Sequence, residues 1–499
     1  MNRPTAIYSA AQVRALDAFE IENRQVPSYT LMTRAAEAAL KILCGRWPQV
    51  RRVTVVCGAG NNGGDGYVLA RLARSAGLDA QVLAAAPPEK LRGDAARAHS
   101  EWLAAGGVAR PFAAEPLADC DLIVDGLLGI GFVGPLRPDT LAVIRAINAA
   151  HRPVLALDVP SGLNADSGEV HEDAVRAEIT VCFVGLKSGL FLGSGPEHAG
   201  VVMLEDLGVV PPAQPGFTPL LRRISERELA PNLPRRARDA HKGSHGRVLI
   251  VGGGHGMPGA LRLAGEAALR VGAGLVTVAG AAENLVAVTA TRPELIYLPA
   301  DSAGGLDEAL RGASVVAIGP GLGRGEWAQK LWSRIRRFEG VPVVVDADAL
   351  NLLASSPAKL PANWILTPHP GEASRLLGSD IKAVQSDRLA AVRELHARYG
   401  AVVVLKGAGT LVAGAAREHP GDIELSICDR GNPGMATAGT GDVLTGVIAG
   451  LLSQVRDSLL AARLGVLIHA LAGDSAAQGG QRGLIASDVI GELRGWVNP

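Results

Sequence analysis

Short apolar runs alternate with amphipathic stretches along most of the chain. In the first half, runs rich in Val, Ile and Leu predict strands near 53–57, 80–85, 121–125, 153–158, 179–184 and 201–204. Apolar residues at helical spacing predict helices near 66–76, 92–105 and 138–150, after two N-terminal helices that follow Ser9 and Pro27. Alternating strands and helices are typical of a parallel sheet covered by helices on both faces. The predicted fold class is therefore α/β.

The pattern is interrupted by the segment VVPPAQPGFTPL, residues 209–220. It contains four prolines and no periodicity, which indicates a domain boundary. The second half then begins again with a strand, a glycine-rich loop, a helix opened by Pro258 and another strand. Further strands are predicted at 295–298, 314–318, 341–345, 363–366, 401–405, 410–413 and 423–427, and three helices close the chain. The halves differ in spacing, so we expect two different α/β domains, residues 1–215 and 222–499.

Composition agrees with this organisation and excludes some functions. At 499 residues the chain is too long for one ordinary domain, and 48% apolar residues with 62 glycines suit parallel sheets. Lys plus Arg (49) balance Asp plus Glu (49), so neither a nucleic-acid nor a membrane partner is expected. The five cysteines show no CxxC spacing, and neither a signal peptide nor an apolar run of about 18 residues is present. We expect a cytoplasmic protein with reduced thiols.

The stretch GAGNNGGDGYVLAR, residues 58–71, has the G-x-G-x-x-G spacing of a dinucleotide-binding loop. A dehydrogenase loop also requires an acid at the end of the next strand, about 20 residues on, to hold a ribose hydroxyl. Here Asp79 stands before that strand, and Glu89 comes late, after two prolines. The residues therefore argue against a redox nicotinamide site in the first half.

Polar side chains follow three predicted strands of the first half instead. Asn61, Asn62 and Asp65 follow one strand, Asp125 ends another, and Asp158 ends a third. The carboxyl ends of parallel strands meet at one edge of a sheet, so the segments containing them should converge. These segments are 58–66, 125–135 and 158–162. Their oxygens suit a hard cation, although Asp125 and Asp158 could each simply cap the following turn.

The most informative stretch of the second half is NPGMATAGTGDVLTGVIAGLL, residues 432–452. It places Asp442 in the first turn of an apolar helix, where free amides and the helix dipole would hold a phosphoryl group. Asp442 could take a proton from a hydroxyl that attacks phosphorus, or it could be only an N-cap. The loop KGAGT, residues 406–410, is a plausible cradle for nucleotide phosphates, and the chain contains no Walker A motif.

Other polar strand ends of the second half are GPGLG (319–323), DADALNLL (346–353) and TPHPGE (367–372). His369 stands between two prolines just before a helix, so we consider it a possible ligand contact. A rival interpretation rests on Gly254, Gly256 and Gly259, which repeat the G-x-G-x-x-G spacing, with Glu283 near the required distance. A nicotinamide oxidoreductase would leave KGAGT and GTGD unexplained, so we rank it second.

The motifs of the first half resemble a known family. GNNGGDG, DGLLGIG followed by GP, and DVPSGLNADSG are similar to those of NAD(P)H-hydrate epimerase domains, over about residues 9–205. The resemblance implies a Rossmann-like domain with a potassium ion held by Asn62, Asp125 and Ser161. It also implies that the substrate binds to Asn61, Asn62, Gly63, Gly64, Asp65, Gly129, Ile130, Gly131, Phe132, Val133, Gly134, Pro135 and Asp158. Asp158 is our candidate for the catalytic group that moves a proton.

The second half, residues 222–497, resembles ADP/ATP-dependent NAD(P)H-hydrate dehydratase domains of the ribokinase-like superfamily. KGSHGRVLIVGGG, GPGLG, DADALNLL, TPHPGE, KGAGT and NPGMATAGTGDVLTG stand in the family's order. The resemblance implies that ADP binds to Lys406, Gly407, Ala408, Gly409, Thr410 and Gly441. It implies that the hydrate contacts Ala260, Gly323, His369 and Asp442, with Asp442 as the catalytic base and Mg²⁺ on the nucleotide phosphates.

Together these resemblances predict a bifunctional repair enzyme for hydrated NADH and NADPH, the compounds NADHX and NADPHX. The first domain would interconvert their R and S forms, and the second would dehydrate the S form with ADP, or ATP, releasing AMP and phosphate when ADP is used. A homo-oligomer is expected by resemblance. Two alternatives remain: a ribokinase-like small-molecule kinase fused to a Rossmann-like domain, and a first domain that only binds ligand.

Overall fold

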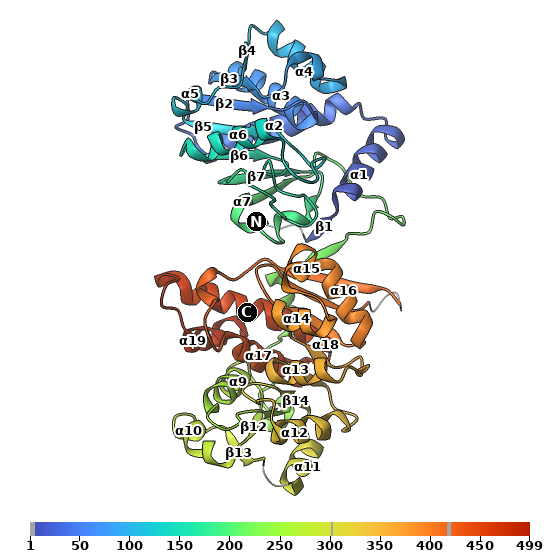
Figure 1. Cartoon of the computed structure of the whole chain (residues 1–499), viewed down its shortest axis with the longest axis vertical. Coiled ribbons are helices and arrows are strands. Elements are labelled where there is room, and N and C mark those ends of the chain that lie inside the picture. The colour runs from blue at the N-terminus through green and yellow to red at the C-terminus, as the bar shows by residue number, and fades with distance from the viewer. Residues whose placement is uncertain (1–4, 301–302, 417–420) are drawn as a thin grey trace. The chain divides into compact units, whose positions relative to one another are not determined.

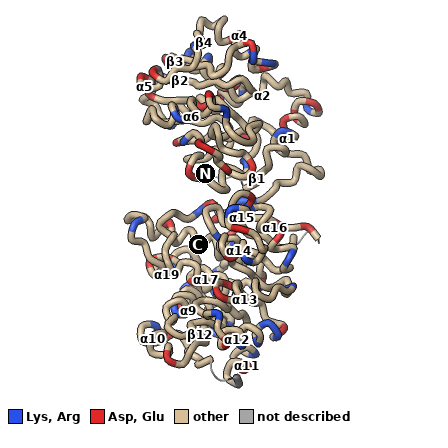
Figure 2. The backbone as a smooth tube through the Cα atoms, in the orientation of Figure 1, with Lys and Arg blue, Asp and Glu red and all other residues tan. Residues whose placement is uncertain are grey.

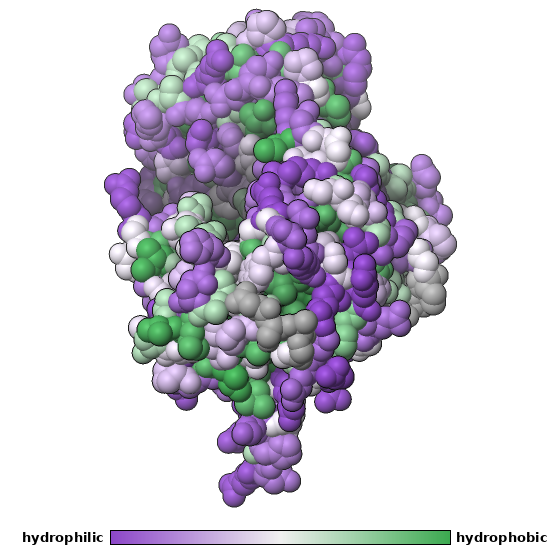
Figure 3. Space-filling model, turned by 60° about the horizontal axis from the view of Figure 1, so that its bottom comes forward, coloured by the Kyte–Doolittle hydropathy of each residue, from purple (hydrophilic) through white to green (hydrophobic). Residues whose placement is uncertain are grey.

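The computed structural model describes residues 5–300, 303–416 and 421–499 and divides the chain into two compact units, Met1–Leu221 and Arg222–Pro499 (Figure 1). The proline-rich segment 209–220 contains neither helix nor strand and ends the first unit. Positive and negative side chains are interspersed along both units (Figure 2), which accords with the balanced composition. Polar and apolar residues also alternate on the face drawn in Figure 3.

The first unit contains a seven-stranded parallel sheet in the order β4-β3-β2-β5-β6-β7-β9. The strands are β2 (Arg52–Cys57), β3 (Asp79–Ala84), β4 (Ala109–Pro111), β5 (Leu122–Gly126), β6 (Val154–Leu157), β7 (Ile179–Phe183) and β9 (Val201–Glu205). Each predicted strand of this half is present, and β4 is the one strand of this sheet that was not expected. The chain runs outward from β2 to β4 and then crosses back to β5, so the strand order reverses between β2 and β5. Open α/β sheets bind their ligands in the crevice at such a point.

Helices cover both faces of this sheet. Val55 packs with α2 and α3, whereas its neighbour Val56 packs with α6 on the opposite face, because successive side chains of a strand point to opposite sides. The predicted three-layer arrangement is confirmed for this unit. The helices are α1 (Ala10–Asn23), α2 (Ser28–Arg46), α3 (Asn61–Ser75), α4 (Gly93–Ala104), α5 (Glu115–Ala118), α6 (Pro138–Ala149) and α7 (Gly195–Ala199), with 3₁₀ turns η1 (Pro88–Lys90) and η2 (Ser188–Leu190).

One boundary in the first unit was predicted wrongly. Helix α3 begins at Asn61, not near residue 66, so the residues Asn61–Asp65 form its first turn instead of a loop. The chain can enter the helix this early because a Cβ at Gly63 would lie only 2.1 Å from the carbonyl oxygen of Gly58. Only glycine permits that approach.

A short parallel pair completes the first unit. Strand β1 (Ala6–Tyr8) pairs with β8 (Leu186–Lys187), in the register Tyr8 with Lys187. Helix α1 follows β1 directly and is capped by Ser9, whose hydroxyl accepts a hydrogen bond from the Gln12 amide at 3.1 Å. These elements bring α1 and Lys187 to the sheet edge where β6 and β7 end.

The second unit contains a mostly parallel sheet. Its order is β13-β12-β11-β14-β15-β16-β17-β18-β19-β10, and only β18 runs antiparallel to both of its neighbours. The strands are β10 (Leu221–Arg223), β11 (Arg247–Val251), β12 (Leu275–Gly280), β13 (Ile296–Pro299), β14 (Val315–Ile318), β15 (Val343–Val345), β16 (Ile365–Leu366), β17 (Val402–Leu405), β18 (Thr410–Ala415) and β19 (Ile423–Cys428). The strands expected from the sequence are present within a few residues of their predicted ends, and β10 was not expected.

The helices of the second unit include the three that were predicted to close the chain, α17, α18 and α19. The helices are α8 (Leu229–Asn232), α9 (Pro258–Arg270), α10 (Leu285–Thr289), α11 (Ala303–Gly312), α12 (Glu326–Arg336), α13 (Ala347–Ser355), α14 (Pro370–Leu377), α15 (Ile381–Ser386), α16 (Arg388–Tyr399), α17 (Thr440–Val455), α18 (Ser458–Ala476) and α19 (Ala486–Trp496). The 3₁₀ turns are η3 (Glu226–Glu228), η4 (Lys242–His245), η5 (Ala282–Asn284), η6 (Pro433–Met435) and η7 (Ala477–Gly479).

Helix α17 lies in the centre of the second unit's core. It packs against α9 and α18 and is buried from Val443 to Ser453. Its neighbour along the chain, the segment Ser458–Gly479, is the one helix among the described residues that is long and apolar enough to cross a membrane. Of its most apolar 18 residues, 61% are buried inside the protein. Burial of that kind is typical of the core helix of a folded domain.

The crossing of α9 and α17 depends on Gly446, because a Cβ there would lie 2.0 Å from the carbonyl oxygen of Ala264. We expect Gly446→Ala to lower the free energy of unfolding of the second unit by about 1–3 kcal/mol, the usual range for an overpacked core. Calorimetry of the full chain would measure this. The matched control is Gly491→Ala in α19, where nothing lies within 4 Å of the added Cβ. That variant should be neutral or slightly more stable, and equal melting of both variants would contradict the prediction.

Candidate active sites

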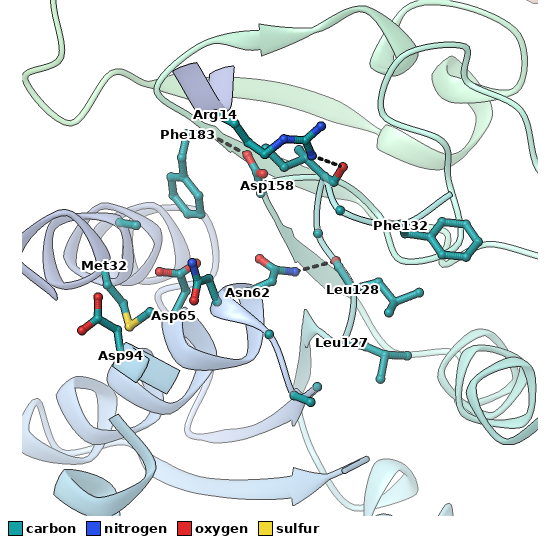
Figure 4. Close-up of a pocket in the computed structure, with 18 of the residues that line it drawn as sticks. Arg14, Met32, Asn62, Asp65, Asp94, Leu127, Leu128, Phe132, Asp158 and Phe183 are labelled. Carbon is teal, nitrogen blue, oxygen red and sulfur yellow. Dashed lines mark hydrogen bonds between the residues drawn. The ribbon is translucent and has the colours of Figure 1, made fainter. Parts of the chain in front are cut away.

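The first unit has a cavity of about 840 Å³ at the carboxyl ends of β2, β5 and β6. The three polar segments predicted to converge meet here, and helix α1 adds a further side (Figure 4). Among the residues expected to bind substrate, the cavity is lined by Asn61, Asn62, Asp65, Gly129, Ile130, Gly131, Phe132, Val133, Pro135 and Asp158. Gly63, Gly64 and Gly134 are not in its lining. Gly64 faces Met32 of α2 instead, at 2.5 Å from an added Cβ.

Oxygen atoms of three strand ends cluster below this cavity. The carboxylate of Asp125, which is fully buried, accepts hydrogen bonds from the Ser161 amide at 2.8 Å and the Ser161 hydroxyl at 2.6 Å. The Asn62 amide group donates to the Leu128 carbonyl at 2.6 Å, and the Leu128 amide donates to the Ser161 hydroxyl at 2.8 Å. The side-chain oxygen of Asn62 is buried and has no partner among the described residues. A buried, unpartnered oxygen beside other oxygens is the arrangement that a hard cation satisfies.

Asp158 forms an ion pair with a lysine that the sequence did not single out. The Nζ atom of Lys187 is fully buried and donates to the Asp158 carboxylate, and also to the Phe183 carbonyl at 2.8 Å. Burial alone would lower the pKa of Lys187, but Asp158 and the other anionic groups together raise it above its usual 10.5. The stability that Lys187 gains from this pair is therefore present below about pH 10.5 and is lost as the pH rises through the higher folded-state pKa.

Asp158 is held in a strained backbone conformation, with a φ of 66°. Its carboxylate also accepts a hydrogen bond from the Phe183 amide at 3.1 Å. Non-glycine residues in the left-handed region cluster at functional sites, where the surrounding structure holds them in place. Asp158 and Asp65 both extend toward the cavity, from β6 and from α3 (Figure 4).

Two more carboxyl groups in the cavity have raised pKa values. Burial raises the pKa of Asp17 to about 6, against a lowering by Lys187, and Asp158 raises it further. Burial also raises the pKa of Asp65 well above its usual range, and Asp158 and Asp17 add to the effect. The cavity therefore combines one neutralised carboxylate with two carboxyl groups that retain protons more readily than usual.

In the second unit, glycine-rich segments after β11 and β14 join backbone to backbone. The Gly253 amide donates to the Pro320 carbonyl at 2.9 Å, and the Gly254 amide donates to the Gly321 carbonyl at 2.7 Å. A Cβ at Gly252 would lie 2.0 Å from the Pro320 oxygen, so this junction requires glycine. Of the three glycines that allowed the oxidoreductase interpretation, Gly254 thus has a structural role at this junction.

Two of the residues expected to contact the hydrate lie at this junction. Gly323 has a φ of 76° and donates its amide to the Asp348 carboxylate at 2.8 Å. Ala260, in the first turn of α9, faces Gly321, whose added Cβ would lie 3.1 Å from the Cβ of Ala260. The Asp348 carboxylate in turn raises the pKa of Asp442. Gly323 and Ala260 therefore lie on the side of the sheet where α17 begins.

Asp442 lies in the first turn of α17 as predicted. Burial raises its pKa to about 7, and the nearby carboxylate of Asp346 adds to this, while Lys406 opposes it. A carboxyl group with such a pKa is half ionised near neutral pH and is suited to general base catalysis.

Lys406 is not a free cation. Its Nζ atom lies 2.8 Å from the Asp346 carboxylate, which also accepts a hydrogen bond from the Thr445 hydroxyl at 2.6 Å. A Cβ on Gly441 would lie 3.5 Å from the same Nζ, so the ion pair lies directly beneath the GTGD turn. The charges of Lys406 and Asp346 therefore nearly cancel, and the pair lies below the start of α17.

His369 is the N-cap of α14. Its Nδ1 accepts a hydrogen bond from the Gly371 amide at 3.0 Å, and its Nε2 lies 3.4 Å from Glu372. Burial lowers the pKa of His369, and Lys406 lowers it further, so the imidazole is neutral near pH 7. Burial raises the pKa of Glu372 to about 7. The half-exposed ring can still offer its Nε2 atom to a ligand.

The KGAGT segment forms a tight turn between β17 and β18. Gly407 and Gly409 have φ angles of 135° and 66°, which glycine adopts without strain. The buried guanidinium of Arg388 donates to the carbonyls of Leu405, Lys406 and Gly409 at 3.2–3.3 Å. Because Arg388 binds the carbonyl groups of the turn, the backbone amides of the turn remain available to a ligand.

Comparison with known proteins supports the resemblances. The model of the family described as NAD(P)H-hydrate dehydratase matches residues 248–494, and the model described as YjeF-related protein N-terminus matches residues 28–189. Over 99% of its length the chain is 46% identical to the bifunctional NAD(P)H-hydrate repair enzyme of Coxiella burnetii, all of which is covered. It is 42% identical to that of Escherichia coli, over 99% of this chain and 95% of the other. The chain belongs to the bifunctional NAD(P)H-hydrate repair enzyme family.

A solved structure supports the predicted fold of the second half. A ribokinase-like superfamily protein from Enterococcus faecalis is 30% identical and has a TM-score of 0.52, covering 56% of this chain and 95% of the other. The ribokinase-like class is therefore confirmed. Full-length membership of the repair enzyme family also removes the support for a nicotinamide oxidoreductase.

Sequence reasoning missed three charged residues of these sites. Lys187 stands in the run CFVGLKSGLF, where a lone charge among apolar residues was a usable signal. Asp17 and Arg388 carry no such signal, because each lies in a helix that contains several other charged residues. Only the packing of those helices against the strand ends reveals them.

The buried ion pair of the first unit makes a prediction about stability. Lys187→Met should lower the free energy of unfolding of the first unit by about 3–5 kcal/mol near neutral pH, because Asp158 would keep an uncompensated charge. Chemical denaturation near neutral pH measures it.

The double variant Asp158→Asn/Lys187→Met is the matched control and should be closer to the wild type than Lys187→Met alone. If Lys187→Met were as stable as the wild type at neutral pH, the pair would contribute nothing to the fold.

Proposed function

We propose that the chain repairs hydrated NADH and NADPH in two steps, with an epimerase in residues 1–215 and an ADP-dependent dehydratase in residues 222–499. One observation carries the proposal: the chain matches bifunctional repair enzymes over 99% of its length and retains both sets of motif residues. The substrates are then NADHX or NADPHX and ADP, with ATP as the alternative phosphoryl donor. A homo-oligomer in the cytoplasm, without nucleic-acid or membrane partners, stays a prediction.

In the epimerase, the nicotinamide end of the hydrate occupies the cavity of the first unit. The C6–O bond breaks with help from the ring-nitrogen lone pair, which gives a planar centre, and water then adds to the other face. Asp158 is the proton-transfer group, and Lys187 holds it at the cavity wall. General acid–base catalysis of this kind contributes about 10²–10⁴-fold in rate.

The oxygen cluster below the cavity fits the predicted potassium ion. Asn62, Asp125 and Ser161 would hold it, and the unpartnered oxygen of Asn62 is the feature that supports the fit. A bound cation would supply positive charge beside the substrate phosphate and would tie the start of α3 to the segment after β5.

In the dehydratase, Asp442 acts as the base. It removes the proton from the C6 hydroxyl as that oxygen attacks the β-phosphorus of ADP, and AMP leaves. The ring nitrogen then expels phosphate from C6, and loss of a proton from C5 restores NAD(P)H. Phosphate leaves far more readily than hydroxide, which is why the nucleotide is required.

The nucleotide would lie over the KGAGT turn and Gly441, with the hydrate against Ala260, Gly323 and His369. Backbone amides of both turns and the start of α17 would hold its phosphates. Among the described residues no group of three or more His, Cys, Asp and Glu could hold a metal ion. Mg²⁺ therefore fits best as part of the nucleotide complex, with phosphate oxygens as ligands.

The two catalytic assignments predict opposite losses. Asp158→Asn should reduce epimerisation by about 10²-fold or more and leave ADP-dependent dehydration of the S form intact, while Asp442→Asn should do the reverse. The measurement starts from an R/S mixture of hydrated NADH and follows the recovery of dihydronicotinamide absorbance with ADP and Mg²⁺. With Asp158→Asn, recovery should stop near the S fraction.

Glu492→Gln, an exposed acid of α19, is the control for Asp442→Asn. Full recovery by Asp158→Asn would remove Asp158 from the mechanism. A stable phosphorylated product from the wild type, with no phosphate released, would favour the small-molecule kinase.

The support of the KGAGT turn predicts a loss of nucleotide affinity. Arg388→Met removes the donors to three carbonyl oxygens and should raise the KM for ADP about tenfold, corresponding to ~1.4 kcal/mol, with epimerisation unchanged. Initial rates of dehydration at varied ADP would measure it. Arg393→Met on the same helix is the matched control. An unchanged KM in both variants would show that the turn does not need Arg388.

A further inference from the structure

Helix α1 brings Asp17 to the epimerase cavity, which is also lined by Asp65, Asp94, Asp139 and Asp158. Asp17 lies on the face of α1 that lines the cavity, one turn after Val13 and Arg14 and one turn before Ile21. The Asp17 side chain forms no hydrogen bond or ion pair with any of the described residues. A carboxyl group in such a place has no evident structural task.

The surroundings of Asp17 make its carboxyl group easier to protonate than that of an ordinary aspartate. Val13, Leu16 and Val184 belong to the apolar cluster around this part of α1, and burial raises the pKa of Asp17 to about 6. Asp158 differs, because its carboxylate receives hydrogen bonds from Lys187 and from the Phe183 amide. One cavity thus holds a carboxyl group suited to donate a proton and a carboxylate suited to accept one.

The reaction needs both kinds of group. A hydroxyl leaves C6 readily only when it is protonated, and the water that returns must lose a proton as it adds to the opposite face of the ring. Asp17 and Asp158 reach the cavity from different elements, α1 and the end of β6, and lie near enough to influence each other's charge.

We propose that Asp17 is a second catalytic residue of the epimerase, the acid that protonates the departing C6 hydroxyl while Asp158 accepts a proton from the water that adds to the opposite face. This inference rests on the proposed epimerase function.

The step balances without any other reactant. The proton of Asp17 forms an O–H bond, the C6–O bond breaks with its electrons leaving on water, and the ring nitrogen supplies the pair for a C=N bond. Water then adds to C6, the C=N electrons return to nitrogen, and the extra proton goes to Asp158. The enzyme is left ionised at Asp17 and protonated at Asp158. That form carries out the reverse conversion, or it returns to the first form by proton exchange with solvent.

The test follows oxygen exchange at C6, which needs no dehydration. Full-length protein and hydrated NADH are mixed in H₂¹⁸O without nucleotide, and uptake of the label is measured by mass spectrometry after the spontaneous rate is subtracted. Asp17→Asn should lower kcat for exchange by about 10²-fold or more with little change in KM, and Asp17→Glu should restore part of it. Glu22→Gln, an exposed acid on the same helix, should exchange at the wild-type rate.

Correct folding of each variant is verified by its ADP-dependent dehydration of the S form and by its melting temperature. A kcat for Asp17→Asn close to the wild-type value, or an effect on KM alone, would overturn the assignment. If the wild type showed no exchange above the spontaneous rate, the epimerase proposal itself would fail.

Discussion

Both sites depend on backbone-to-backbone contact at glycine where neighbouring parallel strands end. In the first unit, a Cβ at Gly58 would lie 1.9 Å from the Leu127 carbonyl oxygen, and in the second, a Cβ at Gly319 would lie 1.8 Å from the Asp346 carbonyl oxygen. Any larger residue would push the segments apart. Asn62 and Asp125 lie within four residues of the first contact, and Asp346, the partner of Lys406, makes the second, so the contacts fix where these site residues lie. The glycine-rich turns of this protein therefore bring neighbouring strands together, and glycine is also the residue that lets a backbone approach phosphate closely.

The two sites also share an electrostatic arrangement. Each has a buried lysine paired with an aspartate, Lys187 with Asp158 and Lys406 with Asp346. In the first unit the paired aspartate, Asp158, faces the cavity. In the second unit the pair lies beneath the GTGD turn, and Asp442, the base that we propose, stands beside it. The same kind of pair can thus hold a carboxylate at a cavity wall or form a nearly neutral support for a loop.

Most of the fold could be predicted from the sequence because its signals are local. Apolar runs gave the strand positions to within a few residues, and the segment 209–220 lacked any periodicity. The start of α3 was wrong because the glycines at 58 and 63 normally indicate a loop, whereas here their close contact lets the helix begin at Asn61. The short strands β4 and β10 were missed because three residues carry too little pattern.

By itself, the sequence determined the α/β class, the candidate domain boundary and the chemistry-bearing motifs, since each depends on neighbours along the chain. Tertiary structure alone decided that Asp17, Lys187 and Arg388 lie at the two sites. Each lies more than 15 residues along the chain from the motif residue beside it in the fold. That residue is Asp158 for Asp17 and Lys187, and Lys406 for Arg388. The charge state of a carboxyl group depends on the groups that surround it in three dimensions, and these surroundings exist only in the folded protein.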